Sequence, residues 1–269
     1  MTKPICLFDS GIGGLTVLKK LLEKSLSGNY IYLADLARVP FGDRTNKEIE
    51  GIAGELIEWL LKFNSKAVIM ACNTSSAVLC RDGRIYPAPT VPLYSMIESC
   101  AKEIAKRNYK KVSVWATKLV VENKGYSSFI KTYNPDIEVE EISCPKLVPM
   151  IEDLNFNYTD KQKIITEYVE KTSKDSEALI LGCTHYPLIQ ESIKKIRDIE
   201  IIDPAVALVN DLEKHLMPRR DAINRVSTGV KPQITLYATA QQEKLQRFSK
   251  IYLGMDLKVN SVSLSKVVV

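Results

Sequence analysis

The sequence lacks the residue patterns of a metal-binding or disulfide-rich protein. It has only two histidines in 269 residues, and none of its six cysteines stands in a C-x-x-C pair, a spacing typical of zinc sites. Six cysteines are also too few for a disulfide framework in a chain of this length. We therefore expect no bound metal, and we expect the thiols to be reduced.

Long apolar runs and a strong charge imbalance are absent as well. No stretch is as long as a membrane span, and residues 1–6 lack the apolar core of a signal peptide. The net charge is only +5, and we interpret the densest basic stretches, residues 106–111 and 219–220, as solvated surface. The sequence therefore predicts a cytoplasmic protein with no nucleic-acid partner and no membrane association.

Apolar residues make up 45% of the chain, which is enough to bury a sizeable core. Short apolar runs predict strands at residues 5–8, 30–34, 67–71, 112–116, 137–142, 178–182, 199–202 and 233–238. Segments with helical periodicity alternate with them, at residues 15–22, 45–61, 160–170, 185–196, 205–216 and 241–252. This order predicts an α/β fold with open, mostly parallel sheets, whose binding residues lie beyond the carboxyl ends of the strands.

Two of the expected strands end alike. Residues 67–74 read AVIMACNT and residues 178–185 read ALILGCTH, so an apolar strand, a small residue, a cysteine and a hydrogen-bonding residue follow in the same order. Cys72 and Cys183 are separated by about the length of one domain. This repeated pattern predicts two related α/β units that each place a cysteine at the same structural point.

A cysteine in a cytoplasmic protein is most often a small buried hydrophobe. We interpret four of the six in this way: Cys6, Cys80, Cys100 and Cys144. Cys72 and Cys183 differ, because each stands where a strand leads into a helix, and the free N–H groups of a helix start favour a thiolate. From the residues alone, a buried role and a catalytic role for these two both remain open.

Two thiols on opposite sides of a substrate could invert a stereocentre. One thiolate would remove a proton from carbon, and the other thiol would return a proton to the opposite face. Asp9, at the end of the first expected strand, could assist Cys72, and His185 could assist Cys183. Glu152 is one of many acids that could orient His185.

The segment from Asp9 to Gly14, DSGIGG, follows a strand and opens a helix, as phosphate-binding loops do. It fits neither G-x-G-x-x-G nor G-x-x-x-x-G-K-[ST], so the sequence does not favour a nucleotide site. The N–H groups of this loop could instead hold a small carboxylate, or its glycines could simply permit a tight turn.

Four motifs together resemble those of the glutamate racemases, the cofactor-independent amino-acid racemases of bacterial cell-wall synthesis. They cover residues 8–14, 37–42, 71–77 and 182–188, in the order and spacing of that family. The aspartate racemases share the two-cysteine plan, but the DSGIGG and GCTHYPL forms are similar to the glutamate branch. The resemblance implies L- or D-glutamate as substrate, no cofactor and a homodimer.

The resemblance also implies a role for each site residue. Cys72, assisted by Asp9, would exchange the α-proton with D-glutamate. Cys183, assisted by His185, would exchange it with L-glutamate, and Glu152 would be the partner of His185. The implied substrate-binding residues are Asp9 and Ser10 for the amine, Asn73, Thr74 and Thr184 for the α-carboxylate, the backbone of Phe41 and Gly42 for the side-chain carboxylate, and also Thr117 and His185.

The family fold has two similar α/β domains related by a pseudo-twofold axis, with the active site in the cleft between them. On this sequence, residues 1–94 and 206–269 would form the first domain and residues 95–205 the second. Because a cleft without water would favour removal of the weakly acidic α-proton, we expect the cleft to open and close.

Two positions depart from the family pattern, and two other functions stay open. Phe41 stands where the family usually has Tyr, and Val120 where it tends to have Thr, so a carboxylate contact is expected to be lost at Val120. The alternatives to glutamate racemase are a racemase of aspartate or a related amino acid, and a non-catalytic protein that binds a carboxylate on the same scaffold.

Overall fold

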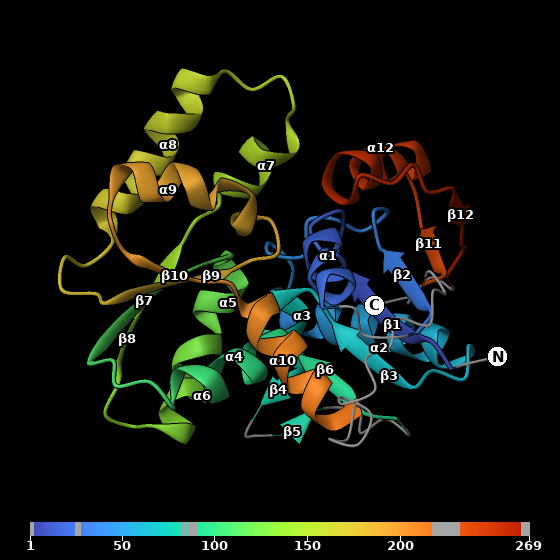
Figure 1. Cartoon of the computed structure of the whole chain (residues 1–269), viewed down its shortest axis with the longest axis horizontal. Coiled ribbons are helices and arrows are strands. Elements are labelled where there is room, and N and C mark those ends of the chain that lie inside the picture. Colours follow the sequence, from blue (N-terminus) through green and yellow to red (C-terminus); the bar gives the residue numbers. More distant parts are fainter. Residues whose placement is uncertain (1–2, 25–27, 82–83, 86–90, 217–231, 265–269) are drawn as a thin grey trace.

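The computed structural model describes residues 3–24, 28–81, 84–85, 91–216 and 232–264. The basic residues at 219–220 therefore lie outside the described part of the chain. Figure 1 shows two lobes: β7 to β10 with α7, α8 and α9 lie on the left, and β1, β2, β3, β11 and β12 with α12 lie on the right.

The first sheet has six strands in the order β12-β11-β2-β1-β3-β6. They are β1 (Ile5–Asp9), β2 (Tyr30–Ala34), β3 (Ala67–Met70), β6 (Leu93–Ser95), β11 (Ile234–Ala238) and β12 (Val259–Ser261). Every pair is parallel, and in β1 the register places Cys6 between Ile31 and Val68. The chain leaves this sheet after β6 and returns to it with β11.

The second sheet has four parallel strands in the order β10-β9-β7-β8. They are β7 (Lys111–Ala116), β8 (Glu138–Ser143), β9 (Ala178–Gly182) and β10 (Glu200–Ile202). A separate antiparallel pair joins β4 (Cys80–Arg81) and β5 (Arg84–Ile85). The expected fold class, α/β with two parallel sheets, is confirmed.

Both sheets reverse their winding direction at one strand. In the first, β2 lies on one side of β1 and β3 on the other; in the second, β8 and β9 flank β7 in the same way. Ligands of open α/β sheets bind beyond the carboxyl ends of strands at such a reversal. Asp9 ends β1 and Cys72 follows β3, whereas Thr117 follows β7 and Cys183 follows β9. The winding therefore places both cysteines at equivalent points.

Helices form three layers around the two sheets. The elements are α1 (Leu15–Glu23), α2 (Asn46–Leu61), α3 (Asn73–Leu79), α4 (Met96–Ile104), α5 (Lys118–Glu122), α6 (Gly125–Tyr133), α7 (Leu147–Glu152), α8 (Tyr158–Lys171), the 3-10 helix η1 (Tyr186–Ile189), α9 (Gln190–Ile196), α10 (Pro204–Leu216) and α12 (Gln242–Leu253). Helices α1, α10 and α12 cover the outer face of the first sheet. Helices α7, α8 and α9 cover the outer face of the second. Helices α2 to α6 fill the space between the sheets.

The side chains of each buried strand alternate between the two cores on either side of the sheet. In β1, Ile5 and Leu7 belong to the outer core, and Cys6 and Phe8 belong to the core between the sheets. In β9, Leu179 belongs to the outer core of the second sheet. Because strand side chains point alternately to the two faces, a strand that is covered on both sides reads as a continuous apolar run. The middle core also includes residues of both sheets, so the two units share it.

Most expected elements lie within a few residues of their predicted bounds, and the exceptions have local causes. Helix α2 begins with a capping box, in which the Thr45 side chain accepts the Glu48 N–H and the Glu48 side chain accepts the Thr45 N–H. The helix expected at 185–196 is divided into η1 and α9. Pro187, which cannot donate a backbone hydrogen bond, lies in the 3-10 part. The sequence does not predict β6 and β12, because each has only three residues and neither lies in a continuous apolar run.

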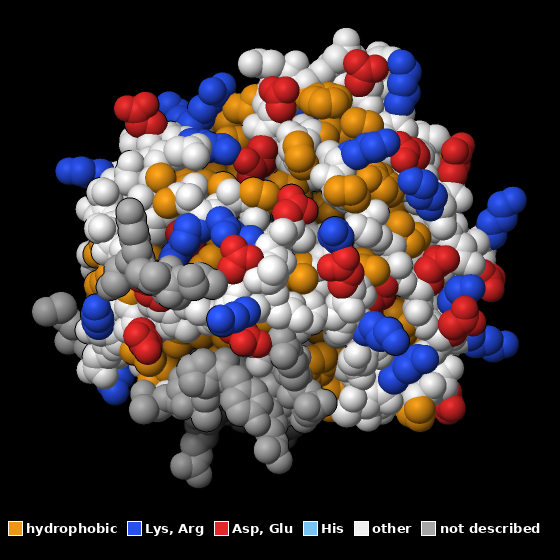
Figure 2. Space-filling view, turned by 180° about the vertical axis from the view of Figure 1, so that it is seen from behind, with side chains coloured by type: hydrophobic (Ala, Val, Ile, Leu, Met, Phe, Trp, Pro, Cys, Tyr) orange, Lys and Arg blue, Asp and Glu red, His pale blue; other side chains and the backbone are white. Residues whose placement is uncertain are grey.

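The described surface is mixed in charge. On the face in Figure 2, Lys and Arg side chains are interspersed with Asp and Glu. Within the stretch 106–111, Arg107 lies 3.3 Å from Glu103 and Lys111 lies 3.0 Å from Glu138. All six cysteines are buried and free. No helix in the described ranges is long and apolar enough to cross a membrane.

Candidate active site

Asp9 is a fully buried carboxylate at the end of β1. The chain turns directly back over it, so the N–H groups of Gly11 and Gly14 donate to Asp9 Oδ2 at 3.1 and 3.0 Å. A side chain at Gly14 would overlap Asp9 and Tyr32, which explains a glycine at this position. Burial raises the pKa of Asp9, although the two N–H groups and the positive charge of His185 oppose this effect.

Cys72 follows β3 and is the N-cap residue of α3, as expected. Its side chain is buried, at 4% exposure. Burial, followed by the negative charge of Asp9, raises the pKa of Cys72 to about 11, although hydrogen bonds from Ser75 lower it. Cys72 is therefore a neutral thiol near pH 7. The start of a short helix does not outweigh the loss of water around the sulfur.

Cys183 stands at the head of a chain of three side chains. Its Sγ lies 3.7 Å from His185 Nδ1, and His185 Nε2 lies 2.9 Å from Glu152 Oε1. Burial lowers the pKa of His185, but hydrogen bonds and charges of Cys183 and Glu152 outweigh it and raise that pKa to about 10. Burial likewise raises the pKa of Glu152, but His185 and Lys244 outweigh it and lower that pKa to about 2. The pair is therefore imidazolium and carboxylate near pH 7.

Several hydrogen-bonding side chains gather at the start of α3, next to Cys72. Tyr126 donates to Asn73 Oδ1 at 2.6 Å, and Asn73 Nδ2 is buried with no hydrogen-bond partner in the described part of the chain. The hydroxyls of Thr74 and Thr117 lie 3.0 Å apart. A Cβ built on Gly42 would lie 3.0 Å from Thr117 Cβ, so the loop at residues 41–42 packs against the same threonine.

The two units meet at Thr184. Its hydroxyl lies 3.5 Å from Asp9 Oδ1, and its carbonyl accepts the Thr16 hydroxyl at 2.9 Å. Ser10, half-buried, belongs to the same loop as Asp9. Cys72 and Cys183 are close enough for the charge of one to act on the other. The structure therefore brings the sequence-predicted residues of both units to one place, while their chemical roles stay predictions.

Val120 and Phe41, the two departures from the family pattern, are both buried. Val120 is 0% exposed and belongs to the core between the sheets, where a Cβ on Gly125 would lie 3.3 Å from Val120 Cγ1. Phe41 is 2% exposed in the same core. An apolar side chain at each position is therefore accommodated by packing.

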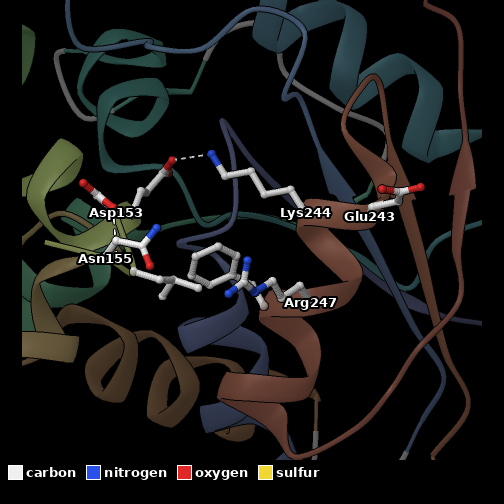
Figure 3. A pocket seen from close by; sticks show the side chains of 8 residues that line it. Asp153, Asn155, Glu243, Lys244 and Arg247 are labelled. Atoms are coloured by element: carbon white, nitrogen blue, oxygen red, sulfur yellow. Dashed lines mark hydrogen bonds and ion pairs between the residues drawn. The ribbon is translucent and has the colours of Figure 1, made fainter.

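The pocket drawn in Figure 3 lies beside this site and not between the cysteines. It is lined by Glu152 and the residues after it, and by α12 residues that include Lys244 and Arg247. The buried donors around Asn73 are not part of its lining. At the cysteine cluster, burial and paired charges perturb the pKa values of several titratable groups at once, as is typical of functional sites. No group of three His, Cys, Asp or Glu side chains in the described ranges has a metal-binding arrangement.

Comparison with known proteins identifies the family of the chain. Residues 15–212 match the family model described as Asp/Glu/Hydantoin racemase. The chain belongs to the Asp/Glu/Hydantoin racemase family. The resemblance seen in the four sequence motifs is thereby confirmed.

Individual members of the family match over nearly the whole chain. Glutamate racemase 2 of Caldanaerobacter subterraneus subsp. tengcongensis is 38% identical over 95% of both chains. The crystal structure of a Francisella tularensis glutamate racemase in complex with D-glutamate has a TM-score of 0.86 at 32% identity, covering 98% of each chain. A Bacillus anthracis glutamate racemase isoform has a TM-score of 0.87 at 26% identity and 97% coverage of each chain.

Two residues that contact the candidate site could not be found from the sequence pattern. Tyr126 lies in α6, far along the chain from Asn73, and Lys244 lies in α12, far from Glu152. Both contacts join a residue of one sheet unit to a residue of the other. A tyrosine or a lysine carries no local signal of such a contact, and only the packing of the two units shows it.

Proposed function

We propose that the chain is a glutamate racemase that interconverts L- and D-glutamate by proton transfer at Cα between two cysteines, without a cofactor. The observation that carries the proposal is that the winding of each sheet places a cysteine at its reversal point, with one assisting group beside each. The named relatives and the D-glutamate complex support glutamate as the substrate.

In the direction from L-glutamate, Cys183 as thiolate would take the α-proton, and the electron pair would spread onto the α-carboxylate. The Cys72 thiol would then deliver its proton to the opposite face of Cα. D-glutamate would leave a Cys183 thiol and a Cys72 thiolate, and proton exchange through His185 and Asp9 would restore the starting state. Because burial keeps Cys72 protonated, this residue suits the role of acid in this direction.

The α-proton is a weak acid, so donors must stabilise the charge on the α-carboxylate as the proton leaves. We assign this role to Asn73, Thr74, Thr117 and Thr184. Asn73 Nδ2 has no hydrogen-bond partner in the described part of the chain, so it is available for a substrate oxygen. The loop from Asp9 to Ser10 would hold the substrate amine, and the backbone of Phe41 and Gly42 would hold the side-chain carboxylate.

Several broader assignments belong to the same proposal. We assign residues 1–94 with 206–269 to one domain and 95–205 to the other; the first sheet uses strands from residues 5–95 and 234–261, and the second from residues 111–202. A cytoplasmic location fits six free thiols. A homodimer and a supply of D-glutamate for peptidoglycan follow from the family resemblance.

Replacing each cysteine by alanine tests the proposal. We expect Cys72→Ala and Cys183→Ala each to abolish racemisation in both directions, because inversion needs an acid and a base on opposite faces. In D2O, however, Cys72→Ala should still exchange the α-proton of L-glutamate, and Cys183→Ala that of D-glutamate. Cys100→Ala, which changes a buried cysteine in α4, is the matched control and should keep full activity.

Three outcomes would redirect the assignment. Normal turnover by either single variant would contradict the two-cysteine mechanism. Faster turnover of aspartate than of glutamate by the intact chain would replace the substrate. Binding of glutamate with no deuterium incorporation at Cα would favour a non-catalytic binding protein.

A further inference from the structure

Glu152, the carboxylate behind His185, is held from two sides. Its Oε1 faces His185 Nε2 at 2.9 Å, and its Oε2 accepts from Lys244 Nζ at 2.7 Å, the contact dashed in Figure 3. The side chains of Glu152 and Lys244 are 22% and 31% exposed. Partial burial strengthens the attraction relative to an exposed ion pair, and two engaged oxygens fix the plane of the carboxylate.

Glu152 lies at a helix end where a nearby cation stabilises its carboxylate. It is the last residue of α7, where the unpaired carbonyl groups of a helix carry partial negative charge. A carboxylate at that end is disfavoured unless a cation lies beside it. The Lys244 ammonium supplies this positive charge, while His185 occupies the other carboxylate oxygen.

The two partners come from different units. Glu152 and His185 belong to the unit of the second sheet, whereas Lys244 is in α12, which packs on the first sheet through Leu245 and Phe248. The contact therefore depends on how the two units sit against each other. Lys244 lines the pocket drawn in Figure 3, and its ammonium points to Glu152 there.

We propose that Lys244 is a positioning residue for the L-glutamate side of the reaction: it holds Glu152 so that Glu152 orients His185 against Cys183. This proposal rests on the proposed racemase function. Lys244 acts through Glu152 and His185 and does not touch the reacting atoms. On the other side, the Asp9 carboxylate is held instead by the backbone N–H groups of Gly11 and Gly14.

The first test is the kinetics of Lys244→Met in the otherwise intact chain. We expect kcat for racemisation to fall about tenfold, a part of the roughly 10²–10⁴ that a positioned acid or base contributes, with KM within about twofold. Lys244→Arg keeps a cation on Glu152 and should restore most of kcat. Lys250→Met is the matched control: Lys250 lies in the same helix, is 71% exposed, and is 4.0 Å from Asp256. It should change neither constant.

The second test separates positioning from a general structural role. In the Cys72→Ala chain, adding Lys244→Met should slow deuterium exchange into L-glutamate about tenfold. In the Cys183→Ala chain, the same change should leave exchange into D-glutamate within about twofold, because that reaction uses Cys72 and Asp9. Proton NMR in D2O measures both rates.

The proposal about Lys244 is overturned if Lys244→Met keeps kcat of the intact chain within about twofold, or if Lys244→Arg fails to restore it. Equal slowing of exchange with both enantiomers also overturns it, because Lys244 would then only hold the two units together. If the unaltered chain does not racemise glutamate at all, the failure lies with the proposed function and not with Lys244.

Discussion

At the scale of single residues, the site consists of buried polar groups whose partners determine what each can do. Cys72 is neutral because its sulfur is buried beside Asp9, whereas His185 is charged because Glu152 and Cys183 surround it. The charge state of each group is therefore set by the side chains around it and not by its place at a strand-to-helix junction.

Tyr126→Phe removes the hydroxyl that donates to Asn73 Oδ1, so the amide of Asn73 would lose its fixed orientation. We expect kcat/KM for glutamate to fall about tenfold, the effect of one buried hydrogen bond. Tyr168→Phe is a matched control, because it removes another buried tyrosine hydroxyl, which contacts the Lys146 N–H in the outer core. An equal loss of kcat/KM in both variants would contradict a specific role for Tyr126.

His185→Gln should change how stability depends on pH. The pKa of His185 rises from 6.5 to about 10 on folding. Its contribution to stability is therefore complete below pH 6.5 and is lost as the pH rises through 10. The pKa of Glu152 falls to about 2 on folding, so the contribution of Glu152 to stability is lost as the pH falls from 4.5 toward 2. Near pH 5–6, we expect the free energy of unfolding of the wild type to exceed that of the variant by on the order of a few kcal/mol.

Urea unfolding across this pH range measures the difference between the two chains. Subtracting the variant's free energy of unfolding from that of the wild type at each pH removes the contribution of the other titratable groups. A difference that stays constant from pH 6 to pH 10 would show that His185 is not an imidazolium in the folded protein.

At the scale of elements, the strands and helices follow local rules closely, and the site residues lie at their ends. Helix α2 begins at Asn46 because Thr45 and Glu48 satisfy each other's backbone N–H groups. Strand β9 ends at Gly182, where a side chain would approach the Trp115 carbonyl to 2.9 Å. The absence of a side chain at Gly182 therefore lets β9 pair closely with β7 up to the residue before Cys183.

Thr45→Ala removes the N-cap of α2 without touching the site. We expect the free energy of unfolding to fall by about 1 kcal/mol, while kcat and KM stay unchanged. Thr132→Ala, at an exposed position inside α6, serves as the comparison and should change stability by less than about 0.5 kcal/mol. Chemical denaturation reports both values, and a larger loss for Thr132→Ala would contradict the capping argument.

At the scale of the whole molecule, two parallel sheets share one apolar core and meet at a polar seam. The seam includes the pair Asn46 and Asn123, whose side chains exchange hydrogen bonds at 3.0 and 2.9 Å. It also includes the contact of Gly13 with Thr184 and His185. The candidate site lies along this seam, so its geometry depends on how closely the units approach.

Gly13→Ala should keep the units apart. A Cβ on Gly13 would overlap Thr184 Oγ1 and lie 2.5 Å from His185 Nδ1, across the seam. Because a displacement of about 1 Å can cost 10²-fold in rate, we expect activity to fall by about that factor. Gly54→Ala is the control: nothing lies within 4 Å of its added Cβ, and it should stabilise α2 by up to about 1 kcal/mol without loss of activity.

The Gly13→Ala prediction is tested by measuring both the activity and the unfolding curve of this variant. A folded Gly13→Ala chain with normal turnover would show that the close approach of Gly13 to His185 is not needed.

The amino-acid sequence by itself determined the fold class, most strands and the positions of both cysteines. These features depend on short-range patterns: apolar runs, helical periodicity and the residues that directly follow a strand. Asp9, Cys72, Cys183 and His185 could be selected because each lies at such a strand end. Glu152 could be named only through the family resemblance, because a single acid among many has no local signature.

Only the tertiary structure decided which side chains act on one another. It gave Glu152 its contacts with His185 and Lys244, and gave Asn73 its contact with Tyr126. It also decided that Cys72 is a thiol, because desolvation depends on everything packed around the sulfur. Hydrogen bonds and charges act over a few ångströms in space, whatever the separation along the chain, so no local pattern could contain them.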